Sequence, residues 1–91
     1  MAAAERQVLD MRHPRIETFD LNLLRIFDAL YQHGSVIAAA TEISVSPSAI
    51  SHALKRLRYT FDDELFVKER GGMIPTPRAT EIAEQVAGIL F

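Results

Sequence analysis

The segment Ser46–Arg58, SPSAISHALKRLR, decides the fold that the sequence predicts. Ser46 is a preferred N-cap residue. Pro47 suits the first position of a helix, because a backbone N–H at that position has no acceptor within the helix and its absence in proline costs nothing. One helical stripe is apolar and consists of Ile50, Leu54, Leu57 and Phe61. A second stripe is polar, free of acids, and consists of Ser48, Ser51, His52 and Lys55. Hydroxyls followed by cations suit a groove lined by base edges and flanked by phosphates, although a solvated helix face can have the same composition.

A second helical pattern precedes this segment. Its apolar stripe consists of Phe19, Leu23, Ile26, Phe27 and Leu30. Asp20 suits its N-cap, and Gly34 suits a left-handed stop after its last turn. Ser35 suits the N-cap of a short helix at about residues 36–43, and we expect Val45 in the following turn to fill the core. Two short helices joined by a tight turn predict a helix-turn-helix motif.

The sequence after the third helix predicts a two-stranded ribbon, or wing. The acidic run Asp62–Glu64 ends the helix, and Leu65–Val67 has the composition of a strand. Glu69–Gly72 suits a hairpin tip because its paired glycines adopt positive φ at no steric cost, and Met73–Ile74 forms the return strand. Two cations flank the tip, Lys68 and Arg70.

A fourth helix is predicted after the wing, with Thr76 as its N-cap and Pro77 at its first position. Its apolar face consists of Ile82, Val86, Ile89 and Leu90. This face has no evident partner elsewhere in the sequence. We therefore expect it to pair with a second copy of the chain, with some packing against the first helix.

Length and composition restrict the class of protein. Ninety-one residues make one small domain, and residues 1–18, which show no helical or strand period, are expected to form a mobile leader. The absence of cysteine excludes disulfides and thiolate chemistry. No apolar run approaches the ~20 residues of a membrane span, and no signal peptide is evident, so a cytoplasmic location is the default expectation.

The net charge of −2 is unevenly distributed. Residues 46–80 hold six basic and four acidic side chains, a balance of +2, whereas residues 1–45 and 81–91 each carry −2. Salt screens charges more than ~8 Å away at physiological ionic strength, so a phosphate responds to the local field. The charge is therefore compatible with DNA binding but does not predict it.

Neither an enzyme nor a metal protein is indicated by the sequence. It contains no Gly-rich phosphate loop, no nucleophile near a histidine and an acid, and no paired carboxylates of buried character. His52 shares no ligand spacing with the other two histidines, and Asp62–Glu64 is a consecutive run unlike the alternating ligands of a calcium loop. We expect no metal, no cofactor and no catalysis. A winged helix that binds another protein is the alternative to DNA binding.

The motifs together resemble the N-terminal DNA-binding domain of LysR-type transcriptional regulators, over about residues 19–91. The resemblance rests on the SPSAIS start of the third helix, the Leu-Phe before the wing, and the Pro-Thr-Pro that opens the fourth helix. It implies a mainly α fold: a winged helix-turn-helix at residues 19–76, with a three-helix core and a two-stranded wing, and an amphipathic linker helix at residues 77–91. It also implies a homodimer on an inverted-repeat site of double-stranded DNA, and a small-molecule effector bound by a C-terminal domain absent from this sequence.

The resemblance also assigns roles to individual residues. Those that face the major groove are Ser46, Pro47, Ser48, Ser51, His52 and Lys55. Those that touch phosphates are Ser35, Arg56, Lys68 and Arg70, and the linker-helix residues that pair two copies are Ile82, Val86, Ile89 and Leu90. Pro47 stands where the family often has glutamine, which removes one bidentate reader of adenine, and Ser44 and Asp62 replace frequent glycines. These departures concern the operator preference rather than the fold.

Overall fold

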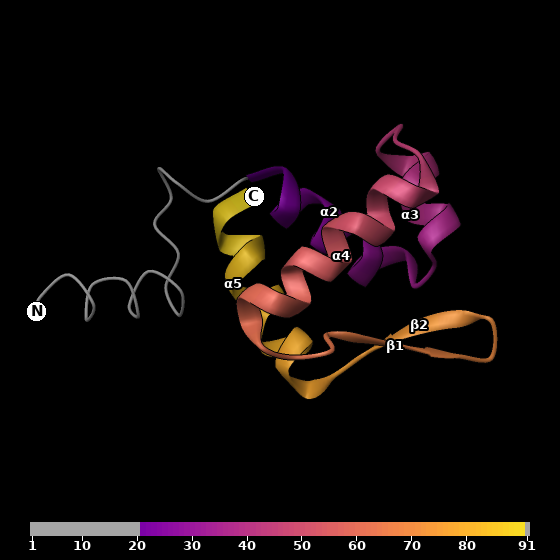
Figure 1. Ribbon diagram of the computed structural model, residues 1–91. Coiled ribbons are helices and arrows are strands. Elements are labelled where there is room, and N and C mark those ends of the chain that lie inside the picture. The colour runs from indigo at the N-terminus through magenta and orange to yellow at the C-terminus, as the bar shows by residue number, and fades with distance from the viewer. Residues whose placement is uncertain (1–20, 91) are drawn as a thin grey trace, which may run out of the picture.

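The computed structural model describes residues 21–90. The expectations for the leader at residues 1–18, for Phe19 in the first apolar stripe and for Asp20 as an N-cap concern residues outside that range. The elements in chain order are α2 (Leu21–His33), α3 (Val36–Glu42), α4 (Pro47–Phe61), β1 (Phe66–Glu69), β2 (Gly72–Pro75) and α5 (Pro77–Leu90). The predicted mainly α winged helix-turn-helix followed by a linker helix is confirmed (Figure 1).

The helix boundaries follow the predicted caps. Gly34 ends α2 in the left-handed region at φ 64°, and its N–H donates to the Leu30 carbonyl at 2.8 Å. Ser35 caps α3 by accepting from the Ala38 N–H at 3.2 Å, and Ser46 caps α4 by accepting from the Ala49 N–H at 3.1 Å. These short side-chain acceptors satisfy donors that the first turn of a helix leaves unpaired.

Val45, in the turn between α3 and α4, does not fill the core as predicted. Its side chain is 38% exposed, and only its backbone is tied inward, through an N–H that donates to the Ala40 carbonyl at 3.0 Å. Small residues do the packing between the two helices, because Ala39 and Ala40 are buried and let the helices approach closely. The turn is therefore held by backbone contacts rather than by an apolar plug.

The core lies between the helices and the base of the wing. Its fully buried large side chains are Phe27, Leu30, Ile50, Leu57, Leu65 and Phe66. Phe27 of α2 and Phe66 of β1 meet with ring centroids 5.4 Å apart and ring planes inclined by 54°, a favourable aromatic arrangement. This contact fixes the start of the wing against α2.

The wing is an antiparallel pair in which Glu69 is opposite Gly72. Its two-residue loop consists of Arg70 at φ 52° and Gly71 at φ 81°, the positive values that a type I′ hairpin turn requires. Gly72 serves a different purpose, because a Cβ there would lie 3.0 Å from the Gly34 carbonyl oxygen. That carbonyl accepts from the Met73 N–H at 2.8 Å, so the wing is fastened to the turn between α2 and α3.

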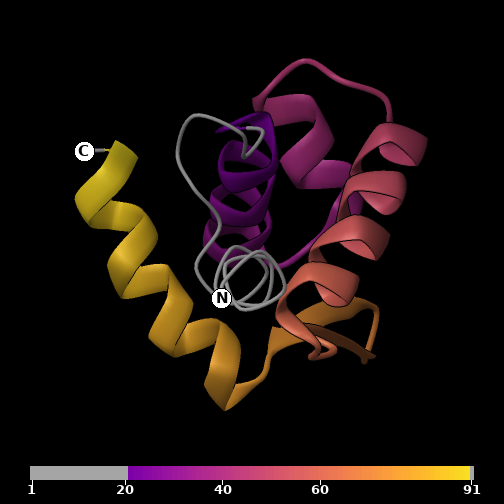
Figure 2. The ribbon, with the colours of Figure 1, turned by 60° about the vertical axis from the view of Figure 1, so that its left-hand side comes forward.

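The burial of two residues of α5 contradicts part of the predicted self-association face. Ile82 and Val86 are 5% and 2% exposed and belong to the core, where α5 packs against α2 (Figure 2). They are therefore not free to meet a second copy of the chain. Ile89 is 50% exposed, and Leu90 ends the helix. Pairing of two copies through α5 stays a prediction, and Ile89 is an exposed apolar residue of this helix that is available for it.

Candidate nucleic-acid interface

The polar face of α4 is open to solvent. Ser48, Ser51, His52 and Lys55 are all exposed, whereas Ile50, Ala53, Leu54 and Leu57 on the opposite face are buried. Within residues 21–90, the side chains of Ser51, His52 and Lys55 make no hydrogen bond or ion pair. The helix therefore rests on the core by one face and presents hydroxyl, imidazole and ammonium groups on the other.

The N-terminal end of this face is partly occupied by its own contacts. The Ser46 hydroxyl accepts from the Ala49 N–H and lies 3.3 Å from the Ser48 hydroxyl, where either oxygen can donate. Pro47 is exposed beside them at the start of α4. Ser46 thus positions the helix start, and its hydroxyl is less free for a ligand than that of Ser51.

A hollow lies between the start of α3, the middle of α4 and the wing. Its lining residues include Ser35, Ser51, Arg58 and Lys68, with the glycines of the wing tip. This hollow thus brings together three of the predicted contact residues from separate parts of the fold: Ser35, Ser51 and Lys68. Arg70 sits in the exposed turn of the wing, and Arg56 is exposed on α4 but does not line this hollow.

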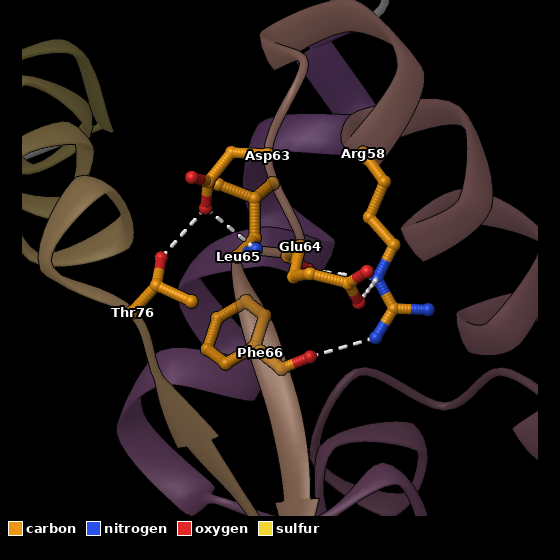
Figure 3. Close-up of polar contacts among 6 residues, drawn as sticks. All are labelled: Arg58, Asp63, Glu64, Leu65, Phe66 and Thr76. Atoms are coloured by element: carbon orange, nitrogen blue, oxygen red, sulfur yellow. Dashed lines mark hydrogen bonds and ion pairs between the residues drawn. The ribbon is translucent and has the colours of Figure 1, made fainter.

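Arg58 has a structural role that the sequence did not indicate. Its Nε donates to the Glu64 carbonyl and its Nη2 to the Phe66 carbonyl, both at 2.7 Å (Figure 3). Phe66 and Pro75 form a non-hydrogen-bonded pair of the ladder, because the adjacent Thr76 N–H donates to the Leu65 carbonyl, so the Phe66 carbonyl points away from β2. The guanidinium therefore supplies donors to the loop and the first strand, and it ties the end of α4 to the wing.

Asp63 joins the same loop to α5. One carboxylate oxygen accepts from the Thr76 hydroxyl at 2.7 Å and from the Leu65 N–H at 2.8 Å (Figure 3). Thr76 in turn accepts from the Ala79 N–H at 3.1 Å, so the predicted N-cap of this helix is confirmed. The hydrogen bonds from Thr76 and Leu65 lower the pKa of Asp63, because they favour the charged carboxylate.

The acidic run Asp62–Glu64 thus ends α4 and holds the following loop. Asp62 is the left-handed C-cap residue at φ 52°. Among residues 21–90, no three histidine or acidic side chains gather in a way that could hold a metal ion. Over the same range, no helix has both the length and the apolar character needed to cross a membrane.

The fold is that of a winged helix-turn-helix domain, and the second helix of the motif, α4, has an exposed polar face. The chain belongs to the LysR family, because the sequence model described as bacterial regulatory helix-turn-helix protein, lysR family, matches residues 21–80. This confirms the family that the SPSAIS, Leu-Phe and Pro-Thr-Pro motifs indicate.

Individual relatives agree with this assignment. The chain is 48% identical over 61 residues to the uncharacterized HTH-type transcriptional regulator YbdO of Escherichia coli K12, a match that covers 67% of this chain and 20% of YbdO. It is 38% identical over 76 residues to the HTH-type transcriptional regulator LeuO of the same strain, covering 84% of this chain and 24% of LeuO. The chain therefore spans about a fifth to a quarter of the length of these relatives.

Solved structures give the same fold. A probable transcriptional regulator of Pseudomonas aeruginosa, PA0477, is 52% identical with a TM-score of 0.78, covering 86% of this chain and 26% of PA0477. The DNA complex of the CbnR DNA-binding domain has a TM-score of 0.75 at 24% identity, covering 79% of this chain and 83% of that one. At that identity the second match establishes the shared fold alone.

Proposed function

We propose that this chain is a sequence-specific DNA-binding domain of a bacterial transcriptional regulator and that α4 enters the major groove. The observation that carries the proposal is the face of α4 on which Ser51, His52 and Lys55 are exposed and without a partner among residues 21–90. Membership of the LysR family supports it, as do relatives named as transcriptional regulators. The DNA-bound CbnR domain supports it through the shared fold.

The dimensions of α4 suit this role. Its 15 residues extend for about 22 Å, and a major groove about 12 Å wide admits one helix. Ser51 and His52 carry donors and acceptors that can meet base edges, which hold the sequence information. Lys55 and Arg56 carry charges that attract phosphates, which fix the position of the helix but distinguish no sequence.

The hollow beside α4 supports a path for one DNA strand. Ser35 at the start of α3 and Lys68 in the wing both line this hollow beside α4. Arg70 at the exposed wing tip extends the positive surface away from the core. We propose that phosphates follow this line while α4 contacts bases, and that two copies pair through α5 on an inverted repeat.

Two alanine variants test the proposal. The affinity of the wild-type chain is first measured by fluorescence anisotropy on a duplex selected from a random pool and on a random duplex. His52→Ala should lose about 1–3 kcal/mol on the selected duplex alone, whereas Lys55→Ala should weaken both and reduce the salt slope by about one. Gln32→Ala, on the exposed side of α2, is the matched control and should change neither.

Two results would contradict the proposal. One is a wild-type chain that binds neither duplex at low salt. The other is a His52→Ala variant that discriminates between the selected and random duplexes as well as the wild type does, because the base-reading role of the α4 face would then be lost.

A further inference from the structure

Tyr59 is an exposed aromatic residue on α4 with no role in the core. Tyr59 is 78% exposed, more than any other large hydrophobic residue among residues 21–89. Over the same range its hydroxyl makes no hydrogen bond and its ring no aromatic contact. A single exposed aromatic side chain is common on protein surfaces, so a ligand is indicated only by the position of Tyr59 on the helix.

The position of Tyr59 continues the polar face of α4. It lies four residues after Lys55, seven after His52 and eleven after Ser48, and all three intervals return to the same side of a helix. The predicted polar stripe ends at Lys55 and does not include Tyr59. In the structure the polar face extends for one more turn and ends in a phenol.

Distance along the helix axis separates Tyr59 from the residues that would read bases. At 1.5 Å per residue, Tyr59 lies about 16 Å beyond Ser48 and about 6 Å beyond Lys55. The major groove is only about 12 Å wide. If Ser48, Ser51 and His52 occupy the groove where α4 crosses it, Tyr59 meets the sugar-phosphate backbone at the edge of that groove.

We propose that Tyr59 is a further DNA contact of this domain, whose hydroxyl donates a hydrogen bond to a backbone phosphate. The inference rests on the proposed function. The acids Asp62, Asp63 and Glu64 follow at once, so the local charge does not favour a phosphate and the proposed contact rests on the hydrogen bond from the hydroxyl alone. A lysine there would be drawn to those acids, as Arg58 is to Glu64 at 3.8 Å, whereas a phenol stays free to meet a phosphate.

Removal of the hydroxyl alone tests the contact. Tyr59→Phe in this chain should bind the selected and the random duplex roughly three- to tenfold more weakly, the effect of one lost hydrogen bond. The slope of affinity against salt should not change, because a phenol releases no counterion, in contrast to Lys55→Ala. Tyr31→Phe is the matched control, since Tyr31 on α2 stacks on Phe27 with centroids 6.2 Å apart. It should bind both duplexes as the wild type does.

The phosphate is identified by neutralising single positions in the selected duplex with methylphosphonates. At one position in each half-site, neutralisation should weaken the wild type but have little further effect on Tyr59→Phe, which shows that the two changes remove the same contact. Thermal melts followed by circular dichroism should give the same midpoint for both variants and the wild type, because neither hydroxyl has a hydrogen-bond partner within residues 21–90.

The outcomes separate this inference from the proposed function. If the wild type binds no duplex, the proposed function fails. If Lys55→Ala weakens binding but Tyr59→Phe binds as the wild type does, the proposed function stands and the Tyr59 contact is refuted. A loss confined to the selected duplex would also overturn the phosphate assignment, because it would show that Tyr59 meets a base.

Discussion

Replacement of Arg58 by alanine should destabilise the domain by about 2 kcal/mol. The guanidinium donates two hydrogen bonds at 2.7 Å to the carbonyls of Glu64 and Phe66. Hydrogen bonds from charged groups contribute about 1.5–3 kcal/mol each, but the side chain is 37% exposed, so water replaces part of what is lost. The ion pair with Glu64 at 3.8 Å adds little, since exposed pairs contribute about 0–1 kcal/mol.

The assay is thermal and urea unfolding followed by circular dichroism. For a domain of this size, about 2 kcal/mol lowers the midpoint of thermal unfolding by about 8–16 °C. Arg56→Ala is the matched control, because Arg56 is exposed two residues earlier on the same helix and has no partner among residues 21–90. It should unfold within about 0.5 kcal/mol of the wild type yet bind all DNA more weakly.

The reasoning fails if the two arginine variants behave alike. An Arg58→Ala protein with the wild-type unfolding midpoint would show that the contacts in Figure 3 do not fasten the wing to α4. An Arg56→Ala protein as unstable as Arg58→Ala would show that the loss of charge, rather than the loss of two hydrogen bonds, causes the effect.

Two further predictions concern the loop carboxylate and the last helix. The folded state lowers the pKa of Asp63, so the stability that the carboxylate contributes is complete above its ordinary pKa of 3.8 and is lost as the pH falls through the lower folded value. Asp63→Asn should reduce this loss of stability at acid pH, measured by urea unfolding at a series of pH values. An unchanged loss would exclude the Asp63–Thr76 hydrogen bond as its source. Ile82→Ala should lower the free energy of unfolding by about 2–5 kcal/mol because it leaves a cavity in the core. Ile89→Ala should change the free energy of unfolding by no more than about 0.5 kcal/mol but should shift the sedimentation of the chain towards that of a monomer. Equal losses of stability in the two variants would contradict the assignment of a buried and an exposed face to α5.

Local signals in the sequence predicted much of the fold. Ser35, Ser46 and Thr76 are caps whose acceptor lies next to the helix it serves, and Gly34 is a stop that needs only positive φ. Such features depend on a few neighbouring residues, so a single sequence indicates them. The exposed face of α4 was predictable for the same reason, since it follows from helical spacing.

Contacts between distant segments were not predictable in this way. Arg58 and Asp63 have no periodic pattern, and their roles arise only where α4, β1 and α5 meet. The turn of the wing lies one residue earlier than the paired glycines predicted. Arg70 and Gly71 form the turn, whereas Gly72 allows a close approach to Gly34. β1 begins at Phe66 rather than Leu65, because Leu65 has φ 65° and donates its N–H to Asp63.

The central claim is that the face of α4 with Ser51, His52 and Lys55 contacts DNA. A nuclear magnetic resonance titration of the isotope-labelled chain with the selected duplex tests this claim most directly. The account predicts that the largest changes in backbone amide shifts fall along residues 48–59 and around the wing tip. Changes concentrated instead in the groove between α2 and α3, at Arg25, Gln32 and Glu42, would contradict it.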